Sequence, residues 1–355
     1  MKGVILAGGV GSRLRPLTLN TPKPIVPIFD RPFLYQQINL LKQVPEIDEV
    51  ILSLNYQPEK IEAIVGHGEE IGIHVRYLVE PYPLGTGGAV KYAEPYLDGT
   101  TIVFNGDILT QINLSTVLET HRSRAAQATI VLTPTDNPLA YGLVESDSDG
   151  TVTRFIEKPN PTQITCNTIN AGIYILEPDT FNRIPPNVNY SIERFYFPSL
   201  IERGDAFSAH INSAYWLDIG TPGKYLQSHR DILDGRCHFE ITTEHADSQP
   251  IVMATAHIDE NARIQPPCFI GSDAVIMSGA TIANYSVIGR GAVIERDAAV
   301  HRSIIWPESH VGIGACLDGT IIGHRCNIGD YAQLGPGVVL GDNSTVTPYT
   351  RATDS

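Results

Sequence analysis

The most constraining feature of this 355-residue sequence is a period of six in its C-terminal part. Aliphatic residues recur at every sixth position from Ile258 to Val300, and after two five-residue steps the pattern continues to Val346. A period of six fits neither a helix nor a strand that alternates faces. It is the hexapeptide signature of a left-handed parallel β-helix, whose aliphatic residues stack inward. A sandwich with chance periodicity is the alternative, but it would have to produce eight successive matches.

The N-terminal part shows a different pattern, in which apolar strand-like runs alternate with helix-like runs. GVILA (3–7) and EVILSL (49–54) are two such strand-like runs. The alternation predicts βαβ units and a doubly wound, Rossmann-like α/β sheet. Hairpin-like runs after residue 140 predict an antiparallel insertion. The predicted organisation is an α/β domain at 1–235, a connector at 236–257 and a hexapeptide-repeat β-helix domain at 258–355.

Composition excludes several classes of function. The chain has 39 acidic and 25 basic residues, a net charge of -14, which argues against general nucleic-acid binding and membrane-surface binding. No apolar run approaches the ~18 residues of a membrane span, and the strand-like run at the N-terminus predicts no secretory signal. Five cysteines without CxxC spacing predict a cytoplasmic protein without a disulfide framework.

A glycine loop, Gly8-Gly9-Val10-Gly11, follows the first strand-like run. Glycines allow backbone N–H groups to approach a phosphate closely. The loop matches neither the dinucleotide fingerprint nor the Walker motif. The first 31 residues carry five bases against one acid, which is +4 in a chain of -14 and favours a polyanionic ligand over a plain solvated turn. The bases are Lys2, Arg13, Arg15, Lys23 and Arg31.

The segment LAGGVGSRLRPLTLNTPKPIVPI (6–28) resembles the signature of the sugar nucleotidyltransferases. These enzymes join a nucleoside triphosphate to a sugar 1-phosphate and release pyrophosphate. The resemblance covers residues 1 to about 235, and the β-helix tail is similar to one branch of the family. The other similar motifs are EPYPLGTGGA (80–89), FNGD (104–107), YG (141–142), FIEKP (155–159), NAGIY (170–174) and WLDIGTP (216–222).

The resemblance implies roles for individual residues. The catalytic residues, which would neutralise the triphosphate, are Arg13 and Lys23. The nucleotide-binding residues are Leu6, Ala7, Gly8, Gly9, Gly11, Ser12, Glu80, Gly85 and Thr86. The sugar-phosphate-binding residues are Gly142, Glu157, Lys158 and Asn170. The ligands of one Mg²⁺ ion are Asp107 and Asp218.

These residue types suit the chemistry. Asp107 follows an apolar strand, which places it at the edge of the sheet where open α/β folds bind ligands. Carboxylates are ligands that Mg²⁺ prefers, although an aspartate here could also cap a turn. A sugar phosphate is largely ionised at pH 7, because its second pKa is about 6, so its attack on a nucleotide phosphorus needs no general base. Positioning and charge neutralisation are then sufficient.

The base and the sugar are predicted from fewer residues. An ionised carboxylate at Glu80 only accepts hydrogen bonds, which favours guanine with its N1–H and N2–H₂ donors. The resemblance points to guanylyl transfer to mannose 1-phosphate. Tyr82, Gly87 and Phe195 depart from that branch, which leaves open heptose phosphate with GTP, or glucose 1-phosphate with UTP or dTTP.

Two readings from other classes remain. A β-helix acyltransferase would need a histidine base, for which His310 and His324 are candidates. A non-catalytic regulatory subunit would be expected to lose the phosphate and metal residues, which are all present here. Because the end coils of a β-helix leave open edges, we expect a homo-oligomer held through this domain. The other expected partners are small-molecule substrates, with no nucleic acid and no membrane.

Overall fold

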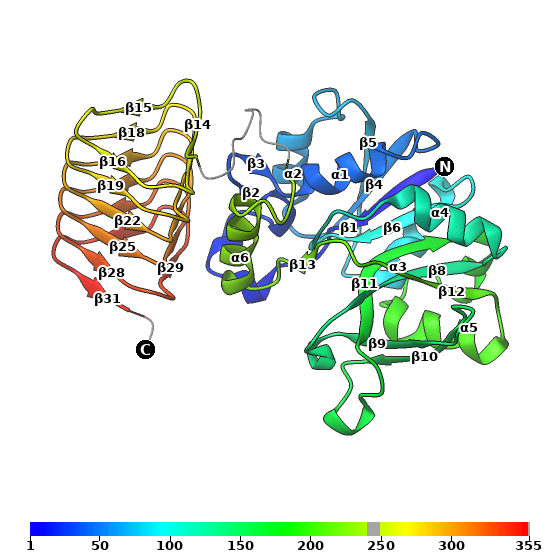
Figure 1. The fold of residues 1–355 in the computed structure, drawn as a ribbon. Helices are drawn as coiled ribbons and strands as arrows, with labels where there is room; N and C mark the ends of the chain where they lie inside the picture. Colours follow the sequence, from blue (N-terminus) through cyan, green and yellow to red (C-terminus); the bar gives the residue numbers. More distant parts are fainter. Residues whose placement is uncertain (240–248, 354–355) are drawn as a thin grey trace. The chain divides into compact units, whose positions relative to one another are not determined.

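The computed structural model describes residues 1–239 and 249–353 (Figure 1). The chain forms two compact units, and neither is continuous in sequence. The first unit contains Met1–Gly9 and Leu34–Trp216, and the second contains Val10–Phe33 and Leu217–Ser355. The glycine loop is therefore divided between the two units. The domain boundaries at 235/236 and 257/258 stay a prediction.

The first unit is built on a mixed nine-stranded sheet with the order β10-β9-β11-β6-β1-β4-β5, in which β8 pairs with β11 and β12 with β8. The strands β6, β1, β4 and β5 are parallel, and β11 is antiparallel to β6. The hairpin of β9 and β10 is the antiparallel insertion expected after residue 140. The strands up to Asp218 are β1 (Lys2–Leu6), β2 (Pro27–Ile28), β3 (Arg31–Pro32), β4 (Glu49–Leu54), β5 (His74–Val79), β6 (Thr101–Asn105), β7 (Ile108–Thr110), β8 (Ala128–Pro134), β9 (Gly142–Ser146), β10 (Val152–Glu157), β11 (Thr168–Leu176), β12 (Phe207–Ile211) and β13 (Trp216–Asp218).

Local sequence explains where the helices begin. The helix α4 begins after Asn113, whose side-chain oxygen accepts a hydrogen bond from Ser115 N at 3.0 Å, as an N-cap residue does. Proline at the first helical position starts α2 and α6, where its missing N–H costs nothing. The α-helices are α1 (Leu34–Lys42), α2 (Pro58–Val65), α3 (Gly85–Ala93), α4 (Leu114–Ser123), α5 (Phe197–Arg203) and α6 (Pro222–Leu233).

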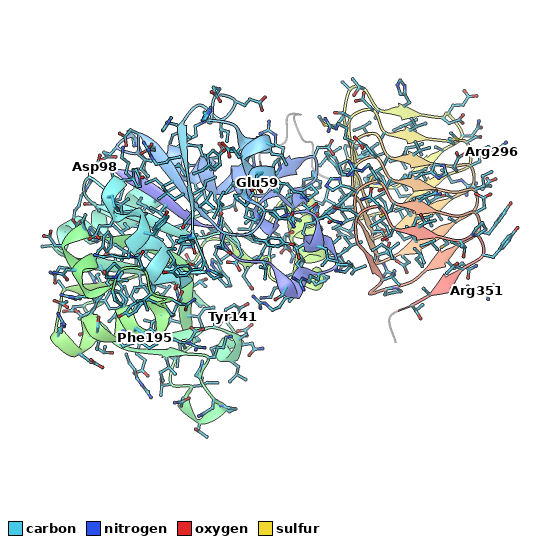
Figure 2. All side chains as sticks on the ribbon, turned by 180° about the vertical axis from the view of Figure 1, so that it is seen from behind. Glu59, Asp98, Tyr141, Phe195, Arg296 and Arg351 are labelled. Carbon is cyan, nitrogen blue, oxygen red and sulfur yellow. The ribbon has the colours of Figure 1, made fainter. Side chains whose placement is uncertain are left out.

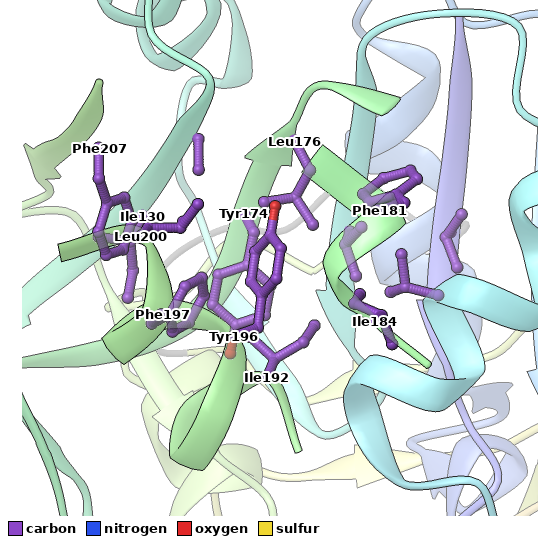
Figure 3. Packing of buried hydrophobic residues seen from close by; sticks show 14 of the residues in the cluster. Ile130, Tyr174, Leu176, Phe181, Ile184, Ile192, Tyr196, Phe197, Leu200 and Phe207 are labelled. Carbon is purple, nitrogen blue, oxygen red and sulfur yellow. The ribbon is translucent and has the colours of Figure 1, made fainter. Parts of the chain in front are cut away.

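An aromatic cluster holds β11 in the core of the first unit (Figure 3). Tyr174 of β11 is fully buried, and its ring lies 5.1 Å from that of Phe197 at a steep angle. Phe197 also stacks on Phe207 of β12 at 5.0 Å. Such ring pairs add to the stability that burial itself provides. The packing therefore fixes the strand on which Asn170 lies.

The second unit contains the β-helix, formed by three parallel six-stranded sheets of very short strands. Strands pair with the equivalent strands of the next coil, so that Ile251 pairs with Phe269 and Val287 with Ile304. The fold class is confirmed as a Rossmann-like domain followed by a left-handed parallel β-helix. The strands are β14 (Ile251–Val252), β15 (His257–Ile258), β16 (Arg263–Ile264), β17 (Phe269–Ile270), β18 (Val275–Ile276), β19 (Thr281–Ile282), β20 (Val287–Ile288), β21 (Val293–Ile294), β22 (Ala299–His301), β23 (Ile304–Ile305), β24 (His310–Val311), β25 (Cys316–Asp318), β26 (Ile321–Ile322), β27 (Asn327–Ile328), β28 (Gln333–Leu334), β29 (Val339–Leu340), β30 (Thr345–Val346) and β31 (Arg351–Ala352).

The coils separate apolar from charged side chains as the period of six requires. Ile276, Ile294 and Val311 are register partners in successive coils and are buried. Arg296 and Arg351 project from the outside of the coils (Figure 2). The ladder begins at β14, inside the stretch that sequence analysis treated as a connector.

Residues 10–33 and α6 are attached to the coils within the second unit. The Asp30 carboxylate accepts hydrogen bonds from Ser272 N at 3.2 Å and Arg290 N at 3.0 Å. The buried Tyr225 hydroxyl donates to the Pro27 carbonyl and accepts from the Trp306 indole N–H. These contacts fix one end of the segment that carries Arg13 and Lys23. Among the residues described, no helix has the length and hydropathy needed to cross a membrane.

Candidate functional site

In the first unit, β1 leads into the glycine loop beside Glu80. Leu6 ends the strand, and Ala7 N donates a hydrogen bond to Ser53 O at 2.9 Å, which continues the sheet by one residue. A Cβ atom on Gly8 would lie 3.1 Å from Glu80 Oε1, whereas one on Gly9 would meet no atom within 4 Å. Glycine at position 8 therefore lets the chain pass close to the Glu80 carboxylate.

Glu80 is only 6% exposed, and its carboxylate is held in place by two donors. Its Oε1 accepts from Ser53 Oγ and its Oε2 from Leu84 N, each at 2.9 Å. Burial raises the pKa of Glu80, and the two hydrogen bonds partly oppose that rise. Since each carboxylate oxygen has two lone pairs, both oxygens still have the capacity to accept a bond from a ligand.

Gly85 and Thr86 begin α3 and lie against the segment 188–193. Gly85 has a left-handed φ of 71°, and a Cβ atom there would lie 2.8 Å from Tyr190 O. The Thr86 hydroxyl donates to Glu193 Oε2 at 2.8 Å and accepts from Ile192 N at 2.9 Å. These contacts give both residues a packing role, and their nucleotide contacts stay a prediction.

The same packing accounts for one of the unusual residues. A Cβ atom on Gly87 would lie 2.8 Å from Tyr190 Cδ1, closer than real Cβ atoms approach. Gly87 N also donates to Tyr190 O at 2.8 Å. Glycine at this position therefore suits the tyrosine at position 190.

Three of the predicted sugar-phosphate residues lie together at the hairpin of β9 and β10. Gly142 and Glu157 are register partners, and a Cβ atom on Gly142 would lie 3.1 Å from Glu157 Oε2. Lys158 is exposed, has a left-handed φ of 53° and donates its N–H to Tyr141 O at 3.1 Å. Burial, and then the charge of Glu193, raises the pKa of Glu157.

Asn170 belongs to an amide pair that sequence analysis did not foresee. Its Nδ2 donates to the hydroxyl of Tyr174 at 2.9 Å, and Asn105 Nδ2 donates to the same hydroxyl at 3.3 Å. Asn170 Oδ1 accepts from Gly172 N at 2.8 Å, where β11 bulges away from β8. Asn105 and Tyr174 stand in the FNGD and NAGIY motifs, so the motifs themselves could have indicated them.

Asp107 is half-buried and follows β6 in a tight turn. Gly106 N donates to Leu6 O at 2.9 Å, and a Cβ atom on Gly106 would lie only 2.6 Å from that oxygen. Glycine is therefore required before Asp107, because the turn is pressed against the end of β1. The prediction that this aspartate lies at the carboxyl end of the parallel strands agrees with its place after β6.

The second unit holds Arg13, Lys23 and Asp218. Gly11 has a left-handed φ of 61°, and its carbonyl accepts from Thr18 Oγ1 at 2.8 Å. A Cβ atom on Gly11 would lie 3.2 Å from Lys23 Cβ, so the loop closes against the stem of that lysine. Ser12 and Arg13 are exposed in the 3₁₀ turn that follows. The loop thus presents Arg13 to solvent.

Asp218 is 6% exposed and forms an ion pair with Lys224 of α6. A Cβ atom on Gly220 would lie 2.9 Å from Asp218 Oδ2 and 3.0 Å from Arg13 Nη2. The aspartate and the guanidinium group therefore both border Gly220. Lys224 was missed by sequence analysis, although it is a basic residue two positions into a helix that follows a predicted metal ligand.

The two predicted metal ligands fit a magnesium ion by their chemistry. Both are carboxylates, and Mg²⁺ is commonly held by one or two carboxylates together with water and phosphate oxygens. Asp107 lies in the first unit and Asp218 in the second, so their sharing of one ion stays a prediction. Among the described residues, no group of three or more His, Cys, Asp or Glu side chains suited to a metal occurs.

Comparisons with known proteins agree with this architecture. The model of the family Nucleotidyl transferase matches residues 2–235, and that of the GMPPB C-terminal domain matches residues 264–353. A mannose-1-phosphate guanyltransferase of Pichia angusta is 37% identical, over 98% of this chain and 92% of that protein. A mannose-1-phosphate guanylyltransferase 1 of Arabidopsis thaliana is 36% identical, over 98% and 92%.

A solved structure is also similar over the N-terminal part. The crystal structure of HddC from Yersinia pseudotuberculosis superposes with a TM-score of 0.56 at 31% identity, covering 64% of this chain and 96% of that one. The same protein complexed with GMP-PN gives a TM-score of 0.55 at 32% identity over the same shares. The chain belongs to the nucleotidyl transferase family, as a nucleotidyltransferase that carries a C-terminal β-helix.

Proposed function

We propose that this nucleotidyltransferase transfers the guanylyl group of GTP to mannose 1-phosphate, giving GDP-mannose and pyrophosphate. The observation that carries the proposal is the Glu80 carboxylate, which is buried and fixed by Ser53 and Leu84 beside the glycine loop. The names of the curated relatives, mannose-1-phosphate guanylyltransferases with matches over nearly the whole chain, support the same reaction.

Glu80 would select the base by offering acceptors alone. Guanine presents N1–H and N2–H₂ on one edge, and one carboxylate can accept from both groups. Hydrogen bonds to a charged acceptor contribute more than neutral ones, and a buried acceptor left without its donor is costly. A uracil or thymine base offers only one N–H on the corresponding edge, so it would leave one carboxylate oxygen without a ligand donor.

The basic residues would neutralise the charge that moves to the leaving pyrophosphate. Arg13 lies exposed on the loop, and the stem of Lys23 packs against Gly11 of the same loop. Lys158 would bind the phosphate of the sugar. Because that phosphate is already ionised, the residues only have to align it with the α-phosphorus and stabilise the developing charge.

Asp107 and Asp218 would hold a divalent metal ion, as nucleotidyltransferases of this kind generally use one. When bound, Mg²⁺ would neutralise phosphate charge and orient the triphosphate. The ion pair with Lys224 places a cation beside the buried Asp218 carboxylate. Glu157 and Asn170 would contact the hydroxyl groups of the sugar.

The test is pyrophosphate release with Mg²⁺, crossing GTP, ATP, UTP, dTTP and CTP with mannose, glucose and heptose 1-phosphates. We expect release with GTP and mannose 1-phosphate. In Glu80→Gln the preference for GTP over UTP should fall by roughly 10-fold or more, which corresponds to one hydrogen bond to a charged group. Glu59→Gln, an exposed change on α2, should leave the preference unchanged.

Other outcomes would correct specific parts of the proposal. Release with GTP and heptose phosphate, or with UTP or dTTP and glucose 1-phosphate, would replace the substrate pair but keep the chemistry. An unchanged nucleotide ranking in Glu80→Gln would remove the role of Glu80. No release with any pair would favour a non-catalytic subunit.

The assembly and location belong to the same proposal. All five cysteines lie in the described ranges and are free, which suits a reducing cytoplasm. Among the described residues, the strands of the first and last coils pair with a neighbouring coil on one side only, which suits a homo-oligomer held through this domain. Light scattering at micromolar concentration would test this, and a monomer mass would contradict it.

A further inference from the structure

A glutamine lies on the buried face of α1, among leucine and isoleucine side chains. Gln37 is 0% exposed, and its neighbours on the same face, Leu34, Ile38 and Leu41, are buried too. Placing an amide side chain in an apolar environment costs free energy unless its polar atoms are hydrogen-bonded. The hydrogen bonds of the Gln37 amide group should therefore explain why it is buried.

The Gln37 amide bonds to both ends of one short turn. Its Nε2 donates to Asn105 O at 2.9 Å and to Ile108 O at 3.1 Å. These carbonyls flank Gly106 and Asp107. The side chain thus uses both N–H donors of its amide group on the turn between β6 and β7.

The oxygen of the Gln37 amide group, unlike its nitrogen, makes no hydrogen bond. Gln37 Oε1 is buried and has no hydrogen-bond partner in the described structure. The amide cannot be turned over, because the two groups beside Nε2 are carbonyl oxygens and require a donor. The protein thus buries one unbonded acceptor and retains two bonds to this turn.

The turn is also fixed from the side of β1. Gly106 N donates to Leu6 O at 2.9 Å, where no Cβ atom would fit. Asp107 therefore lies between three backbone attachments, two made by Gln37 and one by Leu6. A carboxylate on such a turn has little freedom of backbone orientation.

We propose that Gln37 is a positioning residue for Asp107, and that it sets the direction in which this carboxylate meets a divalent metal ion. The inference rests on the proposed function, because it takes Asp107 as a metal ligand. Groups that orient a metal ligand typically change metal affinity by 10–100-fold when they are removed. A methionine side chain of similar volume would fill the site but remove the two donors that Gln37 offers to these carbonyls.

The experiment measures metal binding directly, in the full-length protein with GTP present and no sugar phosphate. The electron paramagnetic resonance signal of free Mn²⁺, compared with a titration of GTP alone because GTP itself binds Mn²⁺, reports the dissociation constant. Gln37→Met should raise this constant about 10-fold or more, and the Mg²⁺ concentration for half-maximal pyrophosphate release should rise with it. Gln36→Met, the same change on a half-exposed neighbour, should alter neither value.

A double-mutant cycle with Asp107→Asn separates positioning from general damage. If Gln37 acts through Asp107, Gln37→Met should cause no further loss of Mn²⁺ affinity in the Asp107→Asn background. Additive losses would overturn the proposal. A lower melting temperature of Gln37→Met with wild-type Mn²⁺ affinity would overturn it too, because Gln37 would then only support the fold.

A second variant and the behaviour of the wild-type protein separate failure of the Gln37 proposal from failure of the proposed function. If Gln37→Met fails to fold, Gln37→Asn retains the amide but is one methylene too short to reach both carbonyls, and it should show the same loss of affinity. If the wild-type protein neither binds Mn²⁺ nor releases pyrophosphate, the proposed function fails. If the wild-type protein does both and the Gln37 variants bind Mn²⁺ equally well, only the role of Gln37 fails.

Discussion

The α/β sheet and the β-helix arrange parallel strands in opposite ways. In the β-helix the strands of each coil pair with the strands of the adjacent coils, and the same small set of residue types fills the interior. In the sheet of the first unit, β1 lies between β4 and β6, so Leu6 pairs with Ser53 on one side and Asn105 on the other. The sheet thus brings together chain segments that lie far apart in sequence, whereas the β-helix brings together only successive coils.

This difference explains why several predicted site residues gather at the end of β1. Ser53 bonds to Glu80, Leu6 precedes the glycine loop, and Asn105 precedes Asp107 by two residues. The three paired residues Leu6, Ser53 and Asn105 are therefore linked to three predicted parts of the site, namely the glycine loop, Glu80 and Asp107. A β-helix position has equivalent neighbours above and below it, so a change there should affect stability more than chemistry.

The largest effect is expected for a change of a single site residue in the first unit. Asp107→Asn keeps the size of the side chain but removes the charge that would hold the metal ion. We expect kcat/KM for pyrophosphate release to fall by roughly 10³-fold, since a metal contributes several kcal/mol to stabilisation of the transition state. The melting temperature should change little.

Asp98→Asn is the matched control, because Asp98 is exposed (Figure 2) and should tolerate the change. Near-wild-type activity of Asp107→Asn would contradict the proposed difference between the sheet and the β-helix, because catalysis would then not depend on this turn.

A truncation inside the coils should have the opposite profile. Ile294 is fully buried between Ile276 and Val311. We expect Ile294→Ala to lower the free energy of unfolding by about 2–5 kcal/mol, because it leaves a cavity. Urea unfolding measures this loss, and kcat/KM per folded molecule should be retained at 25 °C. Arg296→Ala, on the outer surface, should change neither quantity, and a large loss of kcat/KM in Ile294→Ala would show that the coils act on the chemistry.

A pH change should weaken the second unit where α6 meets residue 29. His229 is buried, accepts a bond from Phe29 N at 3.2 Å, and its burial lowers its pKa from 6.5 to about 4. The unfolded state therefore takes up a proton at a higher pH than the folded state does. Stability is fully present above pH 6.5 and is lost as pH falls towards 4, by about 2 kcal/mol between pH 7 and pH 5.

Urea unfolding at both pH values measures this loss. His229→Gln should lose less between the two pH values, and an identical loss in that variant would assign the effect to other groups.

The smallest effect concerns the attachment of residues 10–33 to the coils. Asp30→Asn weakens the bonds from Ser272 N and Arg290 N, because a neutral amide oxygen is a weaker acceptor than a carboxylate. We expect a loss of stability of about 1 kcal/mol and a higher KM for GTP, since this segment carries Arg13 and Lys23. Unfolding and steady-state kinetics with varied GTP measure both, and an unchanged KM would leave the coils a purely structural role.

The repeat could be predicted from the sequence almost residue by residue. Each predicted aliphatic position lies in a short strand, as Ile258 and Ile294 do, although Ile258 in the first coil is exposed and Ile294 is buried. Only the two ends of the repeat lay outside the prediction, and there Val252 and Ala352 continue the same spacing. The prediction succeeds because pairing one coil away requires the same residue type at a constant interval.

The site was predicted only as far as its motifs reach. The motifs indicated Glu80 and Asp107, but not that Ser53 and Leu84 hold the first or that Gln37 holds the turn of the second. Gln37 interrupts the apolar face of α1, a signal that could have marked it. Its partners could not be found, because they lie about 70 residues further along the chain.

The sequence alone therefore determined the two architectures, the family and the residue types that its chemistry requires. Those properties depend on local period and on short motifs, in which neighbouring residues carry the information. Only the tertiary structure decided which side chains fix Glu80 and the turn of Asp107, and that the glycine loop is divided between two compact units. Hydrogen bonding and packing between distant segments decide such contacts, and no local pattern encodes the pairing.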